Sequence, residues 1–410
     1  MESKCGLTEC CDYTLPIVSE YLSDMELSDM YIMSKYINRK LTNTVLIRKV
    51  YTSSEFINMP IDKIKYIHKL HWLSEHKFNG YELPPNLTHL TFENNFNQPL
   101  RVNLLPRTLT HLTFGNLFDQ PLSPGSLPQN LTDLTFGDEF NQPLCFNALP
   151  PTLIYLRFGQ CFNQPLILCV LPQNLIYLKF GDEFDQYVIL KSFLNLTQLT
   201  FGDNFNQLLR SGSLPPNLTK LTFGDEFNKH LRIGTLPPTL THLRFGDNFN
   251  RHLLRGFLPS NLTHLKFGHC FDQLLQIRSL PRTLTHLTFG DSFDQPLLHD
   301  VLPPTLTHLA FGEYFNQLLM PRVLPPNLTQ LEFGRSFNQI LVHDVLPRTL
   351  THLSFGDDYK KPLQISELPQ TLTHLEFGEY FNLQLLIGSF PSNSTRFTFG
   401  YNCITINICR

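Results

Sequence analysis

The sequence predicts a mainly β repeat solenoid of about fifteen 22-residue coils, with a parallel sheet along one face and a small α-helical segment before it. The first observation is a phenylalanine that recurs every 22 residues from Phe92 to Phe180 and, after one 21-residue step, from Phe201 to Phe399. The second is that apolar and polar residues alternate just before each of these phenylalanines, as in a half-buried strand. The third is the spacing of apolar residues in 1–60, which is helical rather than alternating.

Most copies begin with Leu-Pro, and the consensus reads L-P-x-x-L-T-H-L-x-F-G-x-x-F-N-Q-P-L followed by four variable residues. Proline fixes φ and pushes the residue before it into an extended conformation, so Leu-Pro marks where the previous turn ends. The stretch L-T-H-L-x-F then predicts a strand whose fourth and sixth residues point inward and whose third and fifth point outward. The F-N-Q-P-L segment contains a proline and is too short for a regular helix, so we expect turns and extended segments opposite the strands.

Two further positions of the repeat predict contacts between coils. Glycine follows the core phenylalanine in fourteen of fifteen copies, and we expect either a positive φ or a close approach of backbone there. Asn or Asp follows the second phenylalanine in thirteen copies, for example Asn97 and Asp119, and predicts a ladder of side-chain hydrogen bonds to turn backbone. One copy buries too few apolar residues to offset the entropy of ordering it, so the copies must stack on one another.

The chain divides into four segments by pattern. They are a helical segment at 1–60, a degenerate capping repeat at 61–82, the repeats at 83–400 and a C-terminal cap or tail at 401–410. In the degenerate copy, Ile67, Leu70, Trp72 and Phe78 take the core places. We expect its strand to cap the solenoid and to protect the apolar end from edge pairing.

Composition excludes several classes of function. Charged residues make up only 16% of the chain and the net charge is −3, so neither nucleic acid nor a membrane surface is an expected partner. The N-terminus has no basic and apolar leader, and no apolar run is long enough to span a membrane, so we expect a cytoplasmic protein, in the host cytoplasm if it is viral. The nine cysteines match neither zinc spacings nor a disulfide framework, so we expect reduced thiols and no metal or other cofactor.

Catalytic motifs are also missing from the sequence. It contains no nucleophile elbow, P-loop or dinucleotide fingerprint, and Ser, His and Asp recur as columns instead of meeting at one site. We therefore expect no enzyme activity and no small-molecule substrate.

Outward positions of the repeat form columns that could bind a partner. Histidine occupies the third strand position in eight copies, including His242, His264, His286 and His308 in consecutive coils. An acidic column two places after the core phenylalanine includes Asp247 and Asp291, and the basic residues Arg244 and Lys266 lie between the two columns. These eight residues are the predicted partner face.

The histidine column allows three interpretations. The plainest is a structural ladder of stacked imidazoles beside threonine. A metal site is the weakest, because the column has no fixed carboxylate or cysteine partners. A binding face is the third, and for it we expect partner affinity to weaken as the pH falls through about 6.5, where imidazoles gain charge.

Residues FNQPL at 96–100 and 140–144 and FDQPL at 293–297, each inside L-P-x-x-L-T-H-L-x-F-G-x-x-F-N, closely resemble the FNIP repeat. That family is known chiefly from slime moulds and from giant DNA viruses that infect amoebae. It is grouped with the leucine-rich repeats, and the 22-residue period falls within their range, although the usual L-x-L-x-x-N spacing is not kept. The resemblance implies a protein-interaction surface without an assigned chemistry.

The segment 21–35 resembles an F-box. The pattern Y-L-x-x-x-D-L-x-x-L-x-L-V-S-K is met in register by Tyr21, Leu22, Glu26, Leu27, Met30, Ile32, Met33, Ser34 and Lys35. F-boxes bind the Skp1 adaptor of cullin ubiquitin ligases and leave a downstream repeat domain to hold the substrate. The resemblance therefore implies adaptor-binding residues, namely Leu22, Leu27, Met30, Met33 and Lys35.

This segment departs from the F-box pattern in two places. Leu15-Pro16 lies about five residues too close to Tyr21, and Ile37 stands where an aromatic residue is typical. The alternative is a helical domain that only buries the first coil. The leading hypothesis for function is an F-box-type receptor that recruits substrates to a Skp1–cullin ubiquitin ligase, and the alternative is a non-catalytic scaffold or decoy with no link to ubiquitin.

Overall fold

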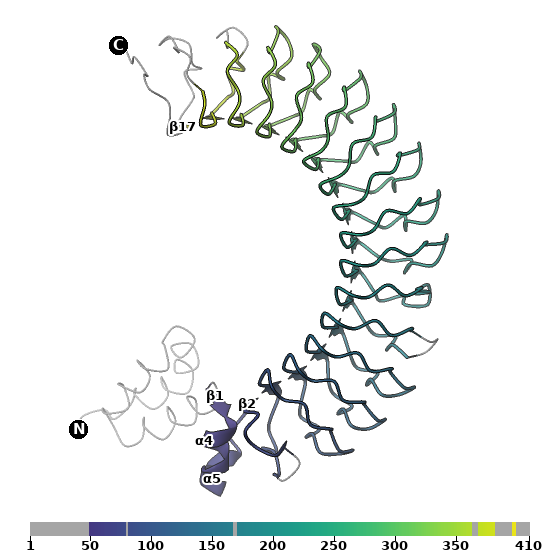
Figure 1. Cartoon of the computed structure of the whole chain (residues 1–410), viewed down its shortest axis with the longest axis vertical. Helices are drawn as coiled ribbons and strands as arrows, with labels where there is room; N and C mark the ends of the chain where they lie inside the picture. Colours follow the sequence, from purple (N-terminus) through teal and green to yellow (C-terminus); the bar gives the residue numbers. More distant parts are fainter. Residues whose placement is uncertain (1–48, 79–80, 167–169, 363–367, 382–395, 399–410) are drawn as a thin grey trace, which may run out of the picture. The chain divides into compact units, whose positions relative to one another are not determined.

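The computed structural model describes residues 49–78, 81–166, 170–362, 368–381 and 396–398. It divides into two compact units, one ending at Asn174 and the other beginning at Leu175. Each unit is a stack of coils in which every coil contributes one short strand to a parallel sheet (Figure 1). The predicted class, a mainly β solenoid with leucine-rich-repeat-like coils, is therefore correct.

The described residues of the first unit form six strands and two short helices. The strands are β1 (Val50–Thr52), β2 (Lys69–Trp72), β3 (His89–Phe92), β4 (His111–Thr113), β5 (Asp133–Thr135) and β6 (Tyr155–Arg157). The helices are α4 (Ser53–Ile57) and α5 (Ile61–Ile64). Consecutive strands from β1 to β6 pair in parallel, and from β3 onward each residue pairs with the residue 22 places later.

In the second unit, the part of the chain that the structure describes forms eleven strands. They are β7 (Tyr177–Lys179), β8 (Gln198–Thr200), β9 (Lys220–Thr222), β10 (His242–Arg244), β11 (His264–Lys266), β12 (His286–Thr288), β13 (His308–Ala310), β14 (Gln330–Glu332), β15 (His352–Ser354), β16 (His374–Glu376) and β17 (Arg396–Thr398). Each is paired in parallel with the next. Regular pairing covers only three residues, fewer than the six of the predicted L-T-H-L-x-F strand. The strand is short because the N–H groups of the threonine and the histidine both bond one carbonyl of the preceding coil. Thr263 and His264, for example, both donate to the carbonyl of Thr241.

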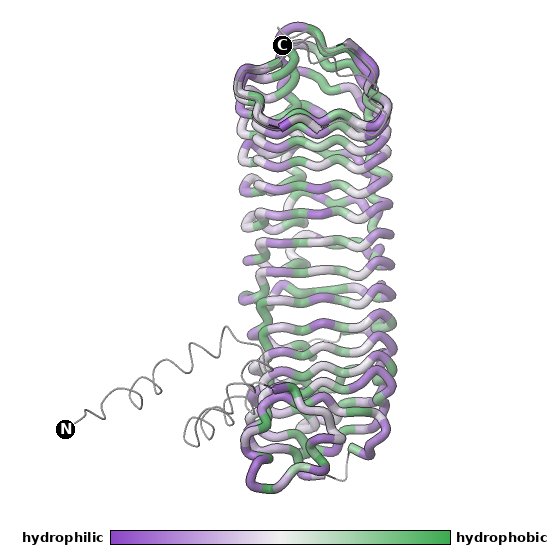
Figure 2. Tube along the Cα trace, turned by 90° about the vertical axis from the view of Figure 1, so that its left-hand side faces the viewer, coloured by the Kyte–Doolittle hydropathy of each residue, from purple (hydrophilic) through white to green (hydrophobic). Residues whose placement is uncertain are grey.

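The predicted alternation places the core inside the coils. In β11 Leu265 and, just after it, Phe267 are buried, whereas His264 is half-buried and Lys266 is exposed. The second phenylalanine of the same coil, Phe271, is fully buried and stacks on Phe267 with 3.8 Å between ring centroids. Figure 2 shows apolar and polar residues returning at the same places in successive coils.

The distance between neighbouring coils of the second unit differs from place to place, depending on the size of the stacked side chains. Between the coils of β10 and β11, the ring centroids lie 4.2 Å apart for the strand histidines, 5.8 Å for the core phenylalanines and 6.2 Å for the second phenylalanines. Neighbouring coils are thus closest at the strand face and wider apart behind it. This wedge bends the stack, so that the strands of the second unit lie on its concave edge (Figure 1).

The glycine after the core phenylalanine allows backbone to touch backbone. A Cβ added at Gly246 would lie 1.9 Å from the carbonyl oxygen of Gly224 in the preceding coil, and its φ is not positive. Close approach, one of the two expected reasons, therefore explains this column. Positive φ occurs instead within the four variable residues, for example at Asn103, Gly125 and Gly256, a column that the sequence analysis did not identify.

The predicted polar ladder connects successive coils. The Oδ1 atom of Asn250 accepts hydrogen bonds from the backbone N–H of Asp272 at 3.1 Å and from Nε2 of Gln273 at 2.7 Å. Asp272 then accepts the equivalent pair from Asp294 and Gln295 in the next coil. Each side chain therefore accepts a hydrogen bond from a turn N–H group of the next coil.

The first described residues differ from the predicted helical segment. Helix does occur at α4, where Thr52 and Glu55 form a capping box, but Val50–Thr52 is a strand that pairs with β2. The strand forms because Tyr51 is buried at the end of the sheet. Among the described residues, the sheet consequently begins one strand before the degenerate repeat.

The degenerate repeat has the predicted core. Its residues Ile67, Leu70, Trp72 and Phe78 are all buried, and Trp72 packs edge-on against Phe78 with 4.9 Å between ring centroids. The rest of segment 1–60 up to residue 48, and the C-terminal segment 401–410, lie outside the described residues. Within the described ranges, none of the helices has the length and apolar character needed to cross a membrane.

We expect Gly246→Ala to destabilise the solenoid by more than about 3 kcal/mol, because the new Cβ overlaps backbone that cannot move without separating two coils. Gly256→Ala is the matched control. Its added Cβ has nothing within 4 Å, so only its positive φ opposes the change, at about 1–2 kcal/mol. Urea unfolding of both variants measures the difference, and equal losses would contradict the close-contact explanation.

Candidate partner-binding face

A ladder of four histidines lies on the strands of the second unit. The rings of His242, His264, His286 and His308, here called the histidine ladder, stack face to face with centroids 4.0–4.2 Å apart. Parallel pairing with residue-for-residue register brings them together, since each histidine pairs with the next along the sheet. The stacked ladder expected from the sequence is therefore present.

Threonine beside each ring determines its tautomer. The Oγ1 atom of Thr263 donates its single hydrogen to the carbonyl of Thr241 at 3.0 Å and lies 2.9 Å from Nδ1 of His264. Because that hydrogen is already used, Nδ1 must carry a proton and donate it to Oγ1. The same pair of contacts recurs at His286 and His308. The neutral ladder therefore keeps Nε2 as a row of hydrogen-bond acceptors.

Burial is the main cause that lowers the pKa of every histidine in this ladder, namely His242, His264, His286 and His308. The effect is largest at His286, where burial and then the charge of the neighbouring ladder histidines lower the pKa to about 4. These rings therefore gain charge at a lower pH than the 6.5 on which the expected loss of affinity was based.

Three basic side chains border the ladder and form, with it, a shallow depression. Lys220, Arg244 and Lys266, here called the basic row, line a hollow of about 330 Å³ together with His242, His264 and His286. Lys220 was not predicted, yet it occupies the histidine position of β9 and pairs in register with His242. Its place in that column was the signal that could have found it.

The remaining predicted residues lie elsewhere. His308 extends the stack beyond the residues that line the depression. Asp247 and Asp291 follow the strands, and their Oδ1 atoms accept backbone N–H bonds from the next coil at 3.3 and 3.4 Å. Asp291 also lies 3.1 Å from Nδ1 of His269. The two aspartates thus form a second structural ladder beside the face.

Acidic residues crowd along this second ladder. Burial, followed by the negative charge of Asp182 and Asp225, raises the pKa of Asp203. Like charges in successive coils favour a ligand that brings positive charge or N–H donors. No group of three or more His, Cys, Asp or Glu side chains in the described part of the chain could hold a metal ion.

The predicted adaptor-binding residues cannot be placed on this surface. Leu22, Leu27, Met30, Met33 and Lys35 all lie outside the described residues. Their interpretation therefore still depends on the sequence pattern alone.

Comparison with known proteins identifies the repeat. The FNIP Repeat family matches residues 76–117, 118–161, 162–193, 195–226, 227–270, 271–314, 315–358 and 359–402. Among solved structures, the chain is similar to CroV588, a circular leucine-rich-repeat protein from a giant virus, with a TM-score of 0.78 and 43% identity over 83% of this chain and 50% of that one. The chain thus spans about half the length of that protein.

The functional domain of InlJ from Listeria monocytogenes matches at a TM-score of 0.44 and 16% identity, over 81% of this chain and 67% of that domain. No curated protein matches the sequence.

We expect the solenoid to lose stability as the pH falls from 7.5 to 5.5. The lowered pKa values mean that the unfolded chain binds more protons than the folded one just below pH 6.5, so stability is complete above that pH and declines below it. For one histidine the loss over this range is at most about 1.4 kcal/mol, reduced by solvent exposure.

The variant His286→Gln isolates this effect, because glutamine occupies the same column at Gln198 and Gln330. Denaturant unfolding at the two pH values should give a smaller pH dependence for the variant than for the parent chain. An unchanged pH dependence would contradict the burial of this imidazole as the cause.

Proposed function

Because the chain belongs to the FNIP-repeat family, we propose that it is a non-catalytic scaffold that binds a protein partner on the strand face of β9–β12. The depression between the basic row and the histidine ladder carries this proposal. It is an inward-curved surface of mixed chemistry, and the third residue of its strands varies from coil to coil while the core does not.

Side chains, and not backbone, must make the contacts with the partner. Every strand from β9 to β12 is paired on both sides, so no free sheet edge is available there for an added strand. Each strand presents its first and third residues outward, and the partner therefore reads two columns. This limits recognition to the basic row and the histidine ladder.

The basic row and the histidine ladder select different groups of the partner, and Lys220 of the basic row lies in the same column as the histidines. Lys220, Arg244 and Lys266 suit carboxylates, and arginine can do so through two parallel hydrogen bonds. The Nε2 row accepts hydrogen bonds instead, so it suits amide, lysine or arginine donors. A partner segment with both acidic and donor groups fits the face better than a uniformly charged one.

Exchange of Arg244 and Lys266 for glutamate should remove partner binding, because it reverses the charge of the basic row without altering the core. Lys179→Glu is the matched control, since Lys179 holds the same strand position in β7, outside the depression. Tagged parent and variant chains, purified from the natural cell, would be compared by quantitative mass spectrometry. Partners retained equally by all three chains would refute the proposal.

The more specific form of the proposal is a receptor that recruits its partner to a Skp1–cullin ubiquitin ligase. It is supported by the F-box-like register of residues 21–35 and would place the protein in the cytoplasm. The other form is a scaffold or decoy without a ubiquitin link. Both share the same strand face.

Binding of the intact chain to purified Skp1 separates the two forms. The F-box form predicts capture of Skp1 by the parent chain and its loss with Leu22→Asp and Leu27→Asp, because aspartate cannot enter an apolar adaptor groove. The Arg244 and Lys266 exchange should leave Skp1 capture unchanged. Absence of any Skp1 capture would leave the scaffold form.

A further inference from the structure

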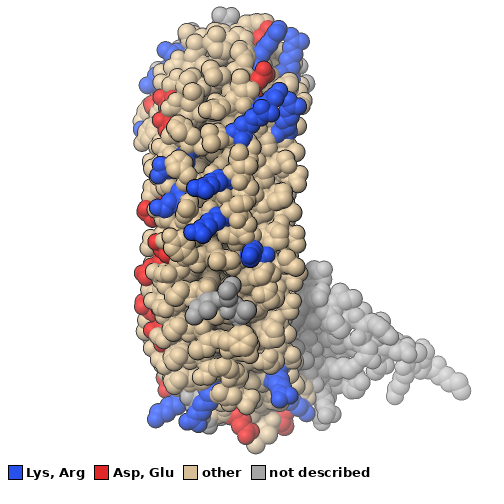
Figure 3. Space-filling model, turned by 90° about the vertical axis from the view of Figure 1, so that its right-hand side faces the viewer, with Lys and Arg blue, Asp and Glu red and all other residues tan. Residues whose placement is uncertain are grey.

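A second hollow lies on the loops of the second unit, away from the strand face. It has a volume of about 500 Å³ and is lined by the loops that lead into β11 and β12. Three of its lining residues, Arg255, Arg278 and Arg282, are arginines, and the lining includes no carboxylate. We call these three residues the arginine cluster. Figure 3 shows lysine and arginine side chains gathering on the loop side, with acidic ones mostly along one edge.

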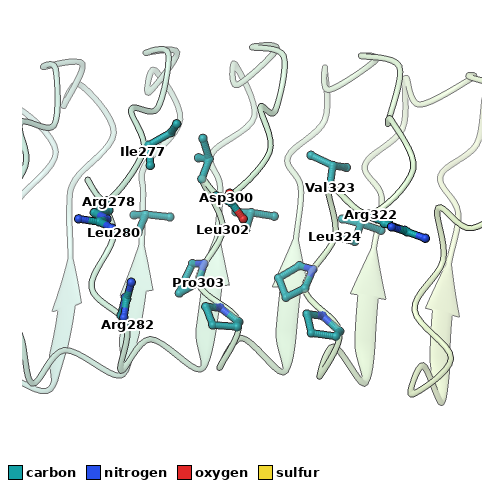
Figure 4. Close-up of a pocket in the computed structure, with 14 residues that line it drawn as sticks. Ile277, Arg278, Leu280, Arg282, Asp300, Leu302, Pro303, Arg322, Val323 and Leu324 are labelled. Carbon is teal, nitrogen blue, oxygen red and sulfur yellow. The ribbon is translucent and has the colours of Figure 1, made fainter.

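The loop that carries Arg278 and Arg282 separates two hollows. On its other side lies a space of about 450 Å³ that also uses Arg278, Leu280 and Arg282 and extends to Asp300 and Arg322 (Figure 4). Arg278 and Arg282 thus border both hollows, whereas Asp300 borders only the second. The positive charge is least compensated in the first.

Arg278 is one of six described non-glycine residues with positive φ in the column of variable residues. It has φ +66° in a column where the three preceding coils have glycine, at Gly212, Gly234 and Gly256. Arginine in this left-handed region costs about 1–2 kcal/mol that glycine does not. Within the described part of the chain, no ion pair forms with the arginine cluster, so no carboxylate neutralises these guanidinium groups.

An unused hydroxyl lies in the same hollow. Ser279 is 2% exposed, and its Oγ has no hydrogen-bond partner among the described residues. In the same column, Ser126 and Ser213 donate to the carbonyl three residues earlier at 2.8 Å. Ser279 therefore differs from its equivalents and keeps a free donor between two arginines. Buried donors without partners are rare, so this one indicates a missing acceptor.

We propose that the arginine cluster and Ser279 bind the phosphate group of a phosphoserine in an extended peptide of a protein partner. Three guanidinium groups supply more donors than a carboxylate can accept, whereas a phosphate has three acceptor oxygens and a charge of about −1.5 to −2. The cluster is too short to follow a nucleic-acid backbone, and the chain as a whole has a net charge of −3. The site is independent of the strand face, so either can fail without the other.

The test uses the intact chain and mixed-sequence peptide libraries of eleven residues, with phosphoserine, serine or glutamate fixed at the centre. We expect retention of the phosphoserine library alone, and competition by inorganic phosphate. Equal retention of the glutamate library would overturn the phosphate assignment. If the chain binds inorganic phosphate but retains none of the peptide libraries, the proposal of a phosphopeptide partner is wrong.

The variants use residues that the same columns already contain. Arg278→Gly restores the glycine of the preceding coils, and Arg282→Gln places the residue found at Gln129 and Gln173. Each should weaken phosphopeptide binding by at least about tenfold through loss of a charged hydrogen bond. Thermal unfolding should be at or above the parent temperature for Arg278→Gly, because the strain at φ +66° is removed.

Arg322→Gly is the matched control. Arg322 has φ +65° in the same column but lies outside the first hollow. Its removal relieves the same strain and should leave phosphopeptide affinity within twofold of the parent. An equal loss in Arg322→Gly and Arg278→Gly would show a general charge effect and would refute the site.

Discussion

The structure depends on contact between the backbones of successive coils at the glycine that follows the core phenylalanine. A Cβ there would lie within 1.9 Å of the preceding coil at Gly246, so no side chain can separate the coils at this place. Stacked phenylalanine rings hold the coils further apart on the far side, at 5.8 to 6.2 Å in the coils of β10 and β11. Residue-for-residue strand register, the asparagine ladder and the bend of the second unit follow from these two spacings.

Sequence reasoning succeeded where one residue type implies one contact. The buried Leu and Phe, the close glycine and the Asn ladder were predictable because each coil repeats them. The positive-φ column was missed because glycine, Asn103 and Arg278 share a backbone angle and not a chemistry. β1 was missed because it lies outside the repeat. The low pKa of His286 depends on ring stacking and burial, which a sequence does not display.

The two candidate surfaces use the repeat in different ways. On the strand face, register converts residues 22 positions apart into a continuous row, so Lys220 joins residues that were predicted as a group. Asp247 and Asp291 were predicted as part of the partner face because they recur in one acidic column. Their hydrogen bonds to turn backbone give them a structural role instead. On the loops, departures from the consensus at Arg278 and Arg282 create chemistry that the strand columns lack. The repeated core residues thus fix where the outward side chains lie, and the variable outward residues determine which partner can bind.

Cysteine pairs placed across neighbouring coils test the central claim, the 22-residue register, most directly. Thr222 and Arg244 are register partners on β9 and β10, whereas Thr222 and Lys266 lie two coils apart. A disulfide requires Cα atoms within about 7 Å, so the Thr222→Cys, Arg244→Cys pair should oxidise readily and the Thr222→Cys, Lys266→Cys pair should not. Mass spectrometry of the oxidised, monomeric chains measures both. Cross-linking of the second pair, or of neither, would contradict in-register stacking of adjacent coils.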